Sequence, residues 1–156
     1  MSRRHTFRKD LSSLYLPYYD ALCSELSGEW QPYCGNRTFM EQTKLYMQGR
    51  ITPGPVVTYA KSGQSAHNYG CASDWCLWEK DKPYWPDPKD PKWREYANAC
   101  EKVGLRWGGE FSHPDCPHNE LFIGCSWNHV LVEYNKGGMR VAQEFIEERL
   151  KARPSL

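Results

Sequence analysis

Apolar side chains recur every three to four residues in several stretches of the chain, which is the spacing of one helix face. The predicted helices are residues 11–26, 38–47, 91–103 and 139–150. Thr38, followed three residues later by Glu41, predicts a capping box at the start of the second helix. Pro17 predicts a kink in the first helix or a later start. Gly28 and Gly104 are expected to end the first and third helices.

Short runs rich in β-branched, aromatic and other apolar residues predict strands between these helices. The predicted strands are residues 30–34, 56–59, 70–78, 105–111 and 118–123. Gly108 and Gly109 predict a bulge or a close backbone approach within the fourth. Residues 79–92, rich in Asp, Lys and Pro, are expected to form a surface loop. Helices first, then strands mixed with helices, indicate an α+β fold with a small, mostly antiparallel sheet and helices packed on it.

The length of 156 residues predicts a single domain, residues 1–156, with its own hydrophobic core. Residues 1–9 are expected to form a loose basic arm, and residues 139–152 a C-terminal helix packed on the domain. Seven Trp and ten Tyr indicate an aromatic core and a groove with aromatic walls, which Tyr84 and Trp85 would border.

The charge and the cysteines exclude several classes of protein. A net charge of +1 and a pI near 7.6 give no argument for a nucleic-acid partner or an anionic membrane. The basic N-terminus is followed by no apolar run, so we expect no signal peptide, no membrane insertion and a cytoplasmic protein. The seven Cys have irregular spacing and no CxxC pair, which favours buried free thiols over a cysteine metal site.

Two short segments bring together the residue types of a catalytic metal site. His67 and Asp74 lie in the first, and Asp115 and His118 in the second. Asp74 shares a strand face with the small residues at positions 70 and 72, which leave space above the sheet. Three of the four side chains could hold a metal, and the fourth could act on a bound water. Catalytic zinc sites have three protein ligands and an open position, whereas structural sites are closed by four.

Each of these residues taken singly also fits an ordinary polar surface or core position. His113 is close enough to the second segment to be a reserve ligand. The tryptophans at 75, 78, 85 and 107 are interpreted as core and rim rather than as a platform for sugars.

Longer motifs carry a family resemblance. They are GNRTFMEQ (35–42), LYMQGR (45–50), GQSAHNYG (63–70), WGGEF (107–111) and DCPHNEL (115–121). In this order they resemble the L-alanyl-D-glutamate peptidases of phage endolysins, which are related to the VanY/VanX-type D-Ala-D-Ala carboxypeptidases and dipeptidases. The resemblance covers residues 11–123 and implies the hedgehog/D-Ala-D-Ala-peptidase-like zinc peptidase fold.

The resemblance implies a Zn²⁺ site with three protein ligands, His67, Asp74 and His118. Asp115 would then be the general base. Arg37 would stabilise the developing oxyanion or hold a substrate carboxylate. Ser65 and Gln64 would line the substrate cleft. Glu120, two residues after His118 on the same strand face, is expected to orient that imidazole.

The sequence therefore predicts a zinc endopeptidase that cuts L-Ala–D-Glu in peptidoglycan stem peptides. We expect a monomeric phage lysis enzyme that stays in the host cytoplasm until a separate membrane-permeabilising protein releases it to the cell wall. One alternative is a D-Ala-D-Ala carboxypeptidase or dipeptidase with the same zinc site. Another is a non-catalytic module that binds the cell wall.

Overall fold

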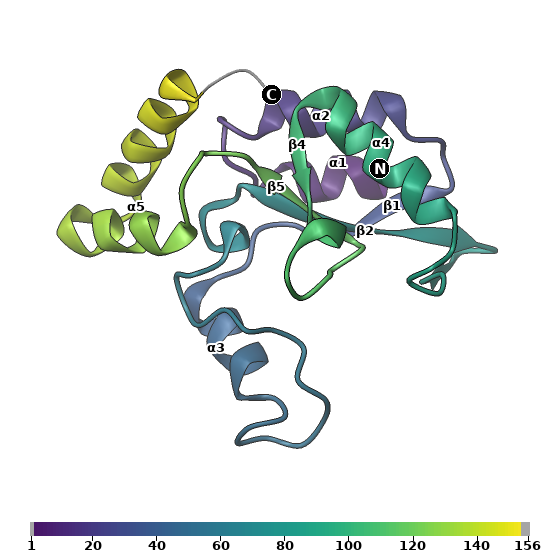
Figure 1. Ribbon diagram of the computed structural model, residues 1–156, viewed down its shortest axis with the longest axis horizontal. Helices are drawn as coiled ribbons and strands as arrows, with labels where there is room; N and C mark the ends of the chain where they lie inside the picture. Colours follow the sequence, from purple (N-terminus) through teal and green to yellow (C-terminus); the bar gives the residue numbers. More distant parts are fainter. Residues whose placement is uncertain (1, 154–156) are drawn as a thin grey trace.

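A five-stranded sheet lies at the centre of the structure, a computed structural model that describes residues 2–153 (Figure 1). The elements are α1 (Arg3–Arg8), α2 (Leu16–Glu25), β1 (Trp30–Cys34), α3 (Phe39–Met47), the 3₁₀ turn η1 (Ala66–Tyr69), β2 (Ala72–Glu79), β3 (Lys82–Tyr84), α4 (Lys92–Val103), β4 (Leu105–Trp107), the 3₁₀ turn η2 (Gly108–Glu110), β5 (His118–Leu121) and α5 (Trp127–Ala152). The strand order is β1-β2-β5-β4, with β3 paired to β2, and every pairing is antiparallel. The predicted α+β architecture is confirmed.

The register of the central strands places the polar residues opposite one another. Asp74 of β2 pairs with His118 of β5, and Arg106 of β4 pairs with Glu120. Because side chains alternate along a strand, these residues share one face of the sheet. The pairing therefore builds a polar face from residues that are far apart in the sequence.

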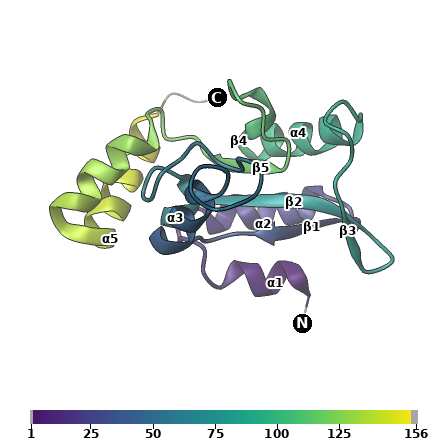
Figure 2. The ribbon, with the colours of Figure 1, turned by 90° about the horizontal axis from the view of Figure 1, so that it is seen from below.

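The opposite face is covered by α2 and α4 (Figures 1 and 2). Tyr15 lies immediately before α2, and its hydroxyl is 2.7 Å from the Ser73 hydroxyl on β2. Tyr19 packs its ring 5.7 Å from that of Trp75. Tyr96 of α4 stacks at 5.1 Å on Trp30 of β1.

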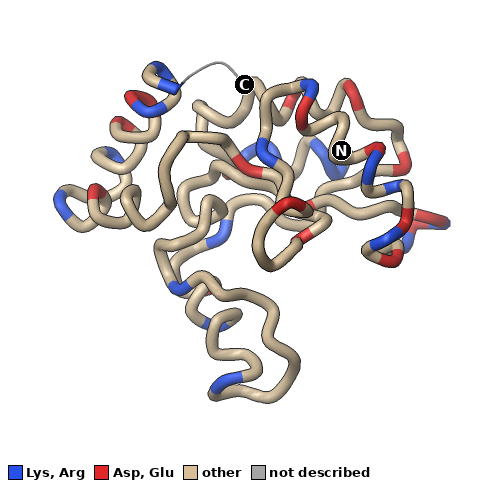
Figure 3. Tube along the Cα trace, viewed as in Figure 1, with Lys and Arg blue, Asp and Glu red and all other residues tan. Residues whose placement is uncertain are grey.

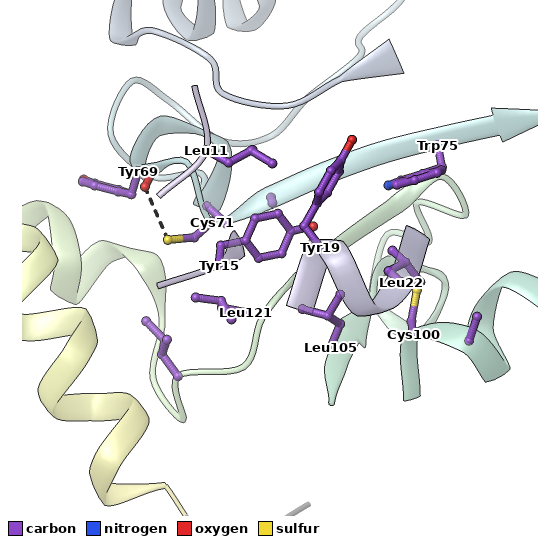
Figure 4. Close-up of a cluster of buried hydrophobic side chains, with 14 of the residues drawn as sticks. Leu11, Tyr15, Tyr19, Leu22, Tyr69, Cys71, Trp75, Cys100, Leu105 and Leu121 are labelled. Carbon is purple, nitrogen blue, oxygen red and sulfur yellow. Dashed lines mark hydrogen bonds between the residues drawn. The ribbon is translucent and has the colours of Figure 1, made fainter. Parts of the chain in front are cut away.

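Aromatic side chains lie in the core, among them Tyr15, Tyr19 and Trp75 (Figure 4). Tyr15, Trp30, Trp75 and Tyr96 are fully buried. The Tyr15 hydroxyl also donates to Asn119, so its burial leaves no unpaired polar group. Burying each ring contributes roughly 1.5–3 kcal/mol, which makes this face the main support for the polar face behind it.

Several predicted helix boundaries are confirmed. Thr38 accepts a hydrogen bond from the Glu41 amide at 3.1 Å, and the Glu41 carboxylate accepts one from the Thr38 amide at 2.7 Å. Helix α2 starts at Leu16 with Pro17 in its first turn, which confirms the prediction of a later start rather than a kink. Gly104 caps α4 in the left-handed conformation. Helix α2 ends at Glu25, before the predicted stop at Gly28.

The predicted loose arm over residues 1–9 is wrong for the residues that the structure describes, because residues 3–8 form helix α1. Arg4 fixes this helix against the body of the protein. Its guanidinium donates to the backbone carbonyls of Cys23, Leu26, Ser27 and Trp30 at 2.5–3.2 Å. The carbonyls come from the end of α2 and the start of β1, which local sequence cannot place beside an N-terminal arginine.

Two strand predictions and one loop prediction are also wrong, in whole or in part. Residues 56–59 form no strand, and Val57 is 52% exposed. Residues 82–84, predicted as loop, form strand β3. The two glycines at 108 and 109 do not bulge a strand but begin the turn η2, which ends β4 at Trp107. The close backbone approach, the other prediction for these glycines, is confirmed at Gly108, where a Cβ would lie 2.6 Å from the Asp115 carbonyl oxygen.

The C-terminal helix is longer than predicted. Helix α5 begins at Trp127, and Gly137 and Gly138 break it with non-helical backbone angles. The second half carries the predicted docking face, in which Ala142 and Ile146 are fully buried. No helix within residues 2–153 combines the length and apolar content that a membrane span requires.

Helix α3 and the chain after it form an arm that projects away from the sheet (Figures 1 and 2). We call residues 39–60 the α3 arm. Its charged residues are Lys44, Arg50 and one acid, Glu41. Blue segments, which mark Lys and Arg, are visible along the arm in Figure 3. The arm stands beside the polar face of the sheet and carries an excess of positive charge.

Candidate metal centre and cleft

Three side chains from separate elements meet on the polar face of the sheet. His67 comes from η1, Asp74 from β2 and His118 from β5. The Asp74 Oδ1 atom is 3.1 Å from His67 Nε2 and 3.0 Å from His118 Nδ1. The two imidazole nitrogens are 3.2 Å apart. All three side chains are buried.

The outer nitrogen of each imidazole is already paired. His67 Nδ1 lies 2.7 Å from the Gly35 carbonyl oxygen, which can only accept a hydrogen bond. His118 Nε2 lies 2.9 Å from the Glu120 carboxylate. In the neutral form, each histidine therefore donates outward and turns a lone pair inward. A carboxylate on the outer nitrogen also orients a histidine that binds a metal.

In that neutral form three electron-pair donors face one another with no proton between them, an arrangement that a bound cation would stabilise. Ligands bound tetrahedrally at 2.0–2.1 Å lie about 3.3 Å apart, close to the separations observed. Burial lowers the pKa of His67, but the Asp74 carboxylate outweighs this and raises it to about 10. Burial and the same carboxylate act on His118, whose pKa is raised to about 9. Both shifts show that the centre favours positive charge.

The turn before β2 gives His67 its position. The Ser65 hydroxyl accepts a hydrogen bond from the His67 amide at 3.3 Å and caps η1. Gly70 then reverses the chain with a φ of 68°, which glycine adopts without strain. A Cβ at Gly70 would lie 2.6 Å from the Ser12 amide nitrogen. The glycine therefore allows η1 to approach the segment before α2 and aims His67 at Asp74.

Asp115 stands at the edge of the metal centre. One of its carboxylate oxygens lies within 4.8 Å of ligand atoms of Asp74 and His118. The loop is held because the Asp115 amide donates to the Gly108 carbonyl at 2.9 Å. Partial desolvation, followed by the negative charge of Asp74, raises the pKa of Asp115. An exposed carboxylate with a raised pKa beside a metal site suits a general base.

Gly108 allows the Asp115 loop to pack, and this gives a testable prediction. A Cβ at Gly108 would lie 2.6 Å from the Asp115 carbonyl oxygen and 2.8 Å from His118 Cβ. Gly108→Ala is therefore expected to displace both residues, at a cost of about 1–3 kcal/mol in unfolding free energy and with a loss of any hydrolytic activity. Thermal unfolding and an activity assay measure the two effects.

Gly28→Ala is the matched control, because a Cβ there meets nothing within 4 Å. It should leave both measurements unchanged. A Gly108→Ala variant with native stability and activity would contradict the packing described for the Asp115 loop.

Arg37 lies on the other side of Asp74. Its Nη2 atom is 3.7 Å from Asp74 Oδ2, and Nη1 donates to the Gln42 side chain at 2.9 Å. Gln42 is fully buried and is itself held by the Ala60 carbonyl at 2.8 Å. The burial of Gln42 was not predicted, since a single glutamine on a helix normally points to solvent.

Two further groups near the centre were not predicted. The Cys34 Sγ atom is 3.9 Å from His67 Nδ1 and 3.3 Å from Arg37 Nη2. Together with His67 and Asp74 it forms a second possible ligand set, and Asp74, Asp115 and His118 lie close enough to form a third. The Gly35 carbonyl, which fixes His67, is a backbone group and leaves no signal in the sequence. All seven cysteines are free, and Cys71, Cys76 and Cys100 are buried.

The metal centre opens into a cleft of about 910 Å³. Ser65 and Gln64 line this cleft, and so do Arg37 and Arg106. The Gln64 side chain accepts a hydrogen bond from the Lys61 amide at 2.9 Å. The predicted contacts of Ser65 and Gln64 with a substrate stay predictions.

His113, the reserve ligand, lies on the cleft wall and not in the metal centre. Its ring packs 4.3 Å from that of Tyr59. The aromatic contact joins the α3 arm to the loop that carries Asp115. Trp85 is 47% exposed and packs edge-on against Tyr33, which lines the cleft. Trp85 therefore contacts a residue of the cleft wall, but neither Trp85 nor Tyr84 is part of the cleft lining.

The fold is shared with a known class of enzymes. The structure is similar to the crystal structure of the Serratia marcescens L-Ala D-Glu endopeptidase ChiX, with a TM-score of 0.60 and 16% sequence identity. The similarity covers 78% of this chain and 88% of that chain. At this identity the comparison establishes the fold.

Residues 58–121 match the family model described as D-alanyl-D-alanine carboxypeptidase. This segment contains the three converging side chains and Asp115, so the similarity includes the candidate site. The chain is also 40% identical over 95 residues to the peptidoglycan L-alanyl-D-glutamate endopeptidase CwlK of Bacillus subtilis (strain 168). This match spans 56% of the present chain and 57% of the length of that relative.

Proposed function

We propose that the protein is a zinc-dependent endopeptidase that hydrolyses the L-Ala–D-Glu bond in peptidoglycan stem peptides. The observation that carries the proposal is the convergence of His67 Nε2, Asp74 Oδ1 and His118 Nδ1 within 3.2 Å, with Asp115 beside them. Two imidazoles and one carboxylate are a donor set found in catalytic zinc sites. The similarity to CwlK and the fold shared with ChiX support the choice of bond.

His67, Asp74 and His118 would hold the zinc ion, which would supply Lewis acidity toward the scissile carbonyl and would lower the pKa of a water molecule to about 7. Asp115 accepts the proton of the attacking water and returns it to the departing amine. Arg37, whose guanidinium lies 3.7 Å from Asp74, faces the cleft and stabilises the negative charge that develops on the carbonyl oxygen. Glu120 and the Gly35 carbonyl hold the two imidazoles in the required tautomers.

The main alternative is a D-Ala-D-Ala carboxypeptidase or dipeptidase. Its support is the description of the family model that matches residues 58–121. The same zinc, base and guanidinium would serve either reaction, so the distinction lies in the cleft. A non-catalytic wall-binding module is disfavoured, because Asp115 would serve no purpose in a site that only binds.

Digestion of purified sacculi tests the proposal. We expect new D-Glu amino termini, detected by mass spectrometry of the products after amine labelling. Release of D-Ala without new D-Glu termini would replace the proposal with the carboxypeptidase alternative. Asp115→Asn, which removes the proposed base, is the matched control for a contaminating hydrolase.

We also propose that the protein acts as a monomeric phage lysis enzyme. It would be made in the host cytoplasm and reach the cell wall after a separate protein permeabilises the membrane. The support for this is the resemblance of its motifs to phage endolysins. Co-expression with and without a membrane-permeabilising protein tests it: lysis that needs both proteins is the expected result, and lysis by this protein alone would contradict it.

A further inference from the structure

We infer that Arg106 binds the free carboxylate of the D-Glu residue in the stem peptide and so sets the preference for an acidic substrate. The inference rests on the proposed function and concerns the same cleft. An L-Ala–D-Glu bond leaves D-Glu with two carboxyl groups, one of which continues the chain. The other stays charged beside the scissile bond unless it is amidated.

Two arginines, Arg37 and Arg106, line the cleft. They differ in how many protein partners their guanidinium groups already bind. Arg37 is 15% exposed and is held by Gln42, Cys34 and Asp74. Arg106 is 52% exposed, and among residues 2–153 its one ion pair is with Glu120, at 3.6 Å. Most of its donors therefore remain available to a ligand.

An aromatic contact, rather than hydrogen bonds, positions the Arg106 guanidinium. It lies over the ring of Phe111, 4.5 Å from the centroid. Phe111 in turn packs 5.5 Å from the ring of His118. Stacking on an aromatic face leaves the edge of a guanidinium, with its paired N–H groups, free for a carboxylate. The group is thus oriented and lies one side chain away from a metal ligand.

Glu120, the ion-pair partner of Arg106, is already bound to His118. Glu120 is 5% exposed, and its other oxygen accepts from His118 at 2.9 Å. Because a shorter contact binds Glu120 to His118, the 3.6 Å pair uses little of the capacity of Arg106. The surroundings of Arg106 therefore favour a second carboxylate supplied by the substrate.

Two synthetic peptides test the inference with the zinc-loaded full chain. One is L-Ala-γ-D-Glu-L-Lys with a free carboxylate, and the other is its D-isoglutamine analogue, in which that carboxylate is an amide. We expect wild type to cleave the carboxylate peptide with a kcat/KM about 10- to 100-fold higher, the range for a charge-assisted hydrogen bond. Arg106→Gln should remove this preference, mainly by raising KM for the carboxylate peptide. The kcat/KM for the amide peptide should stay within about twofold of the wild-type value.

Arg106→Lys keeps the charge but not the paired donors, and should recover part of the preference. Arg94→Gln is the matched control, since Arg94 is an exposed guanidinium near another ring, that of Trp107. Arg94→Gln should leave kcat/KM unchanged for both peptides. Zinc content and thermal unfolding of each variant confirm that the fold and the metal centre are intact.

A wild-type enzyme that cleaves both peptides equally well would overturn the inference and leave the proposed function standing. An Arg106→Gln variant that loses kcat equally on both peptides would also overturn it, because Arg106 would then act only by positioning Glu120 and His118. If the wild type cleaves neither peptide but releases D-Ala from sacculi, the proposed function fails and the inference fails with it.

Discussion

Asp115→Asn is expected to lower turnover by about 10²- to 10⁴-fold, the usual contribution of a general base, while the metal content stays at the wild-type level. Asn keeps the shape of the side chain but cannot accept a proton. The substitution leaves the three converging side chains in place, because Asp115 lies beside them and contributes no atom to their 3.0–3.2 Å contacts. The prediction thus separates proton transfer from metal binding.

The dependence of kcat/KM on pH adds a second readout. Asp115 works only when ionised, so activity is lost as pH falls through its pKa. Desolvation and the charge of Asp74 raise this pKa above the ordinary aspartate value near 3.9. The acid limb of the profile is therefore expected above that value in wild type, and the residual activity of Asp115→Asn should lack the limb that belongs to this carboxyl.

Asp87→Asn is the matched control for this change. Asp87 is an exposed acid whose side chain accepts from the Lys89 amide, a bond that Asn also makes. It should leave turnover and the pH profile unchanged. Wild-type turnover in Asp115→Asn would remove Asp115 as the base and point to another proton acceptor in the cleft.

His118→Ala is expected to abolish both metal binding and hydrolysis. The substitution leaves two ligands on an ion that needs three protein donors to stay in an open catalytic site. Loss of the ion removes several kcal/mol of transition-state stabilisation, a decrease of about 10³-fold or more in rate. Metal analysis after gel filtration and a peptide assay measure the two effects on one sample.

The effect on stability should follow the metal. A ligand that binds only the folded state at 1,000 times its Kd stabilises it by about 4 kcal/mol. Added zinc should therefore raise the melting temperature of wild type and leave that of His118→Ala unchanged. Glu120→Gln is expected to fall between them, because partners that orient a ligand contribute about 10- to 100-fold in metal affinity.

Cys34→Ser is the control for the ligand assignment. Its thiol lies on the outer side of His67, near the nitrogen that the Gly35 carbonyl already occupies. The variant should retain metal and activity. Retention of metal by His118→Ala together with its loss in Cys34→Ser would instead favour the second ligand set of Cys34, His67 and Asp74.

Much of the site was accessible from sequence because its signals are local or strictly ordered along the chain. The two short segments supply His67, Asp74, Asp115 and His118, and the family resemblance singles out three of them as ligands. Strand alternation places Glu120 on the face of His118, where it contacts that imidazole. The capping box of Thr38 and Glu41 was predicted because both partners lie within one helical turn. The antiparallel sheet followed from the order of helices and strands.

What the sequence missed depends on contacts between distant segments. Helix α1 is fixed by Arg4, whose carbonyl partners lie 19 to 26 residues away. Gln42 is buried with its side chain hydrogen-bonded to the Arg37 guanidinium and the Ala60 carbonyl. The segment 56–59 has strand-like residues but no neighbouring strand to pair with, so its propensity is overridden. Arg106 acquires its place in the cleft only through the β4–β5 register.

Titration of the metal-free protein with zinc, followed by cleavage of an L-Ala–D-Glu peptide, tests the central claim most directly. The protein stripped by a chelator should be inactive. Activity should then rise in proportion to added zinc and reach its limit at one equivalent per chain, as one centre of three ligands requires. Full cleavage by the metal-free protein would contradict the account.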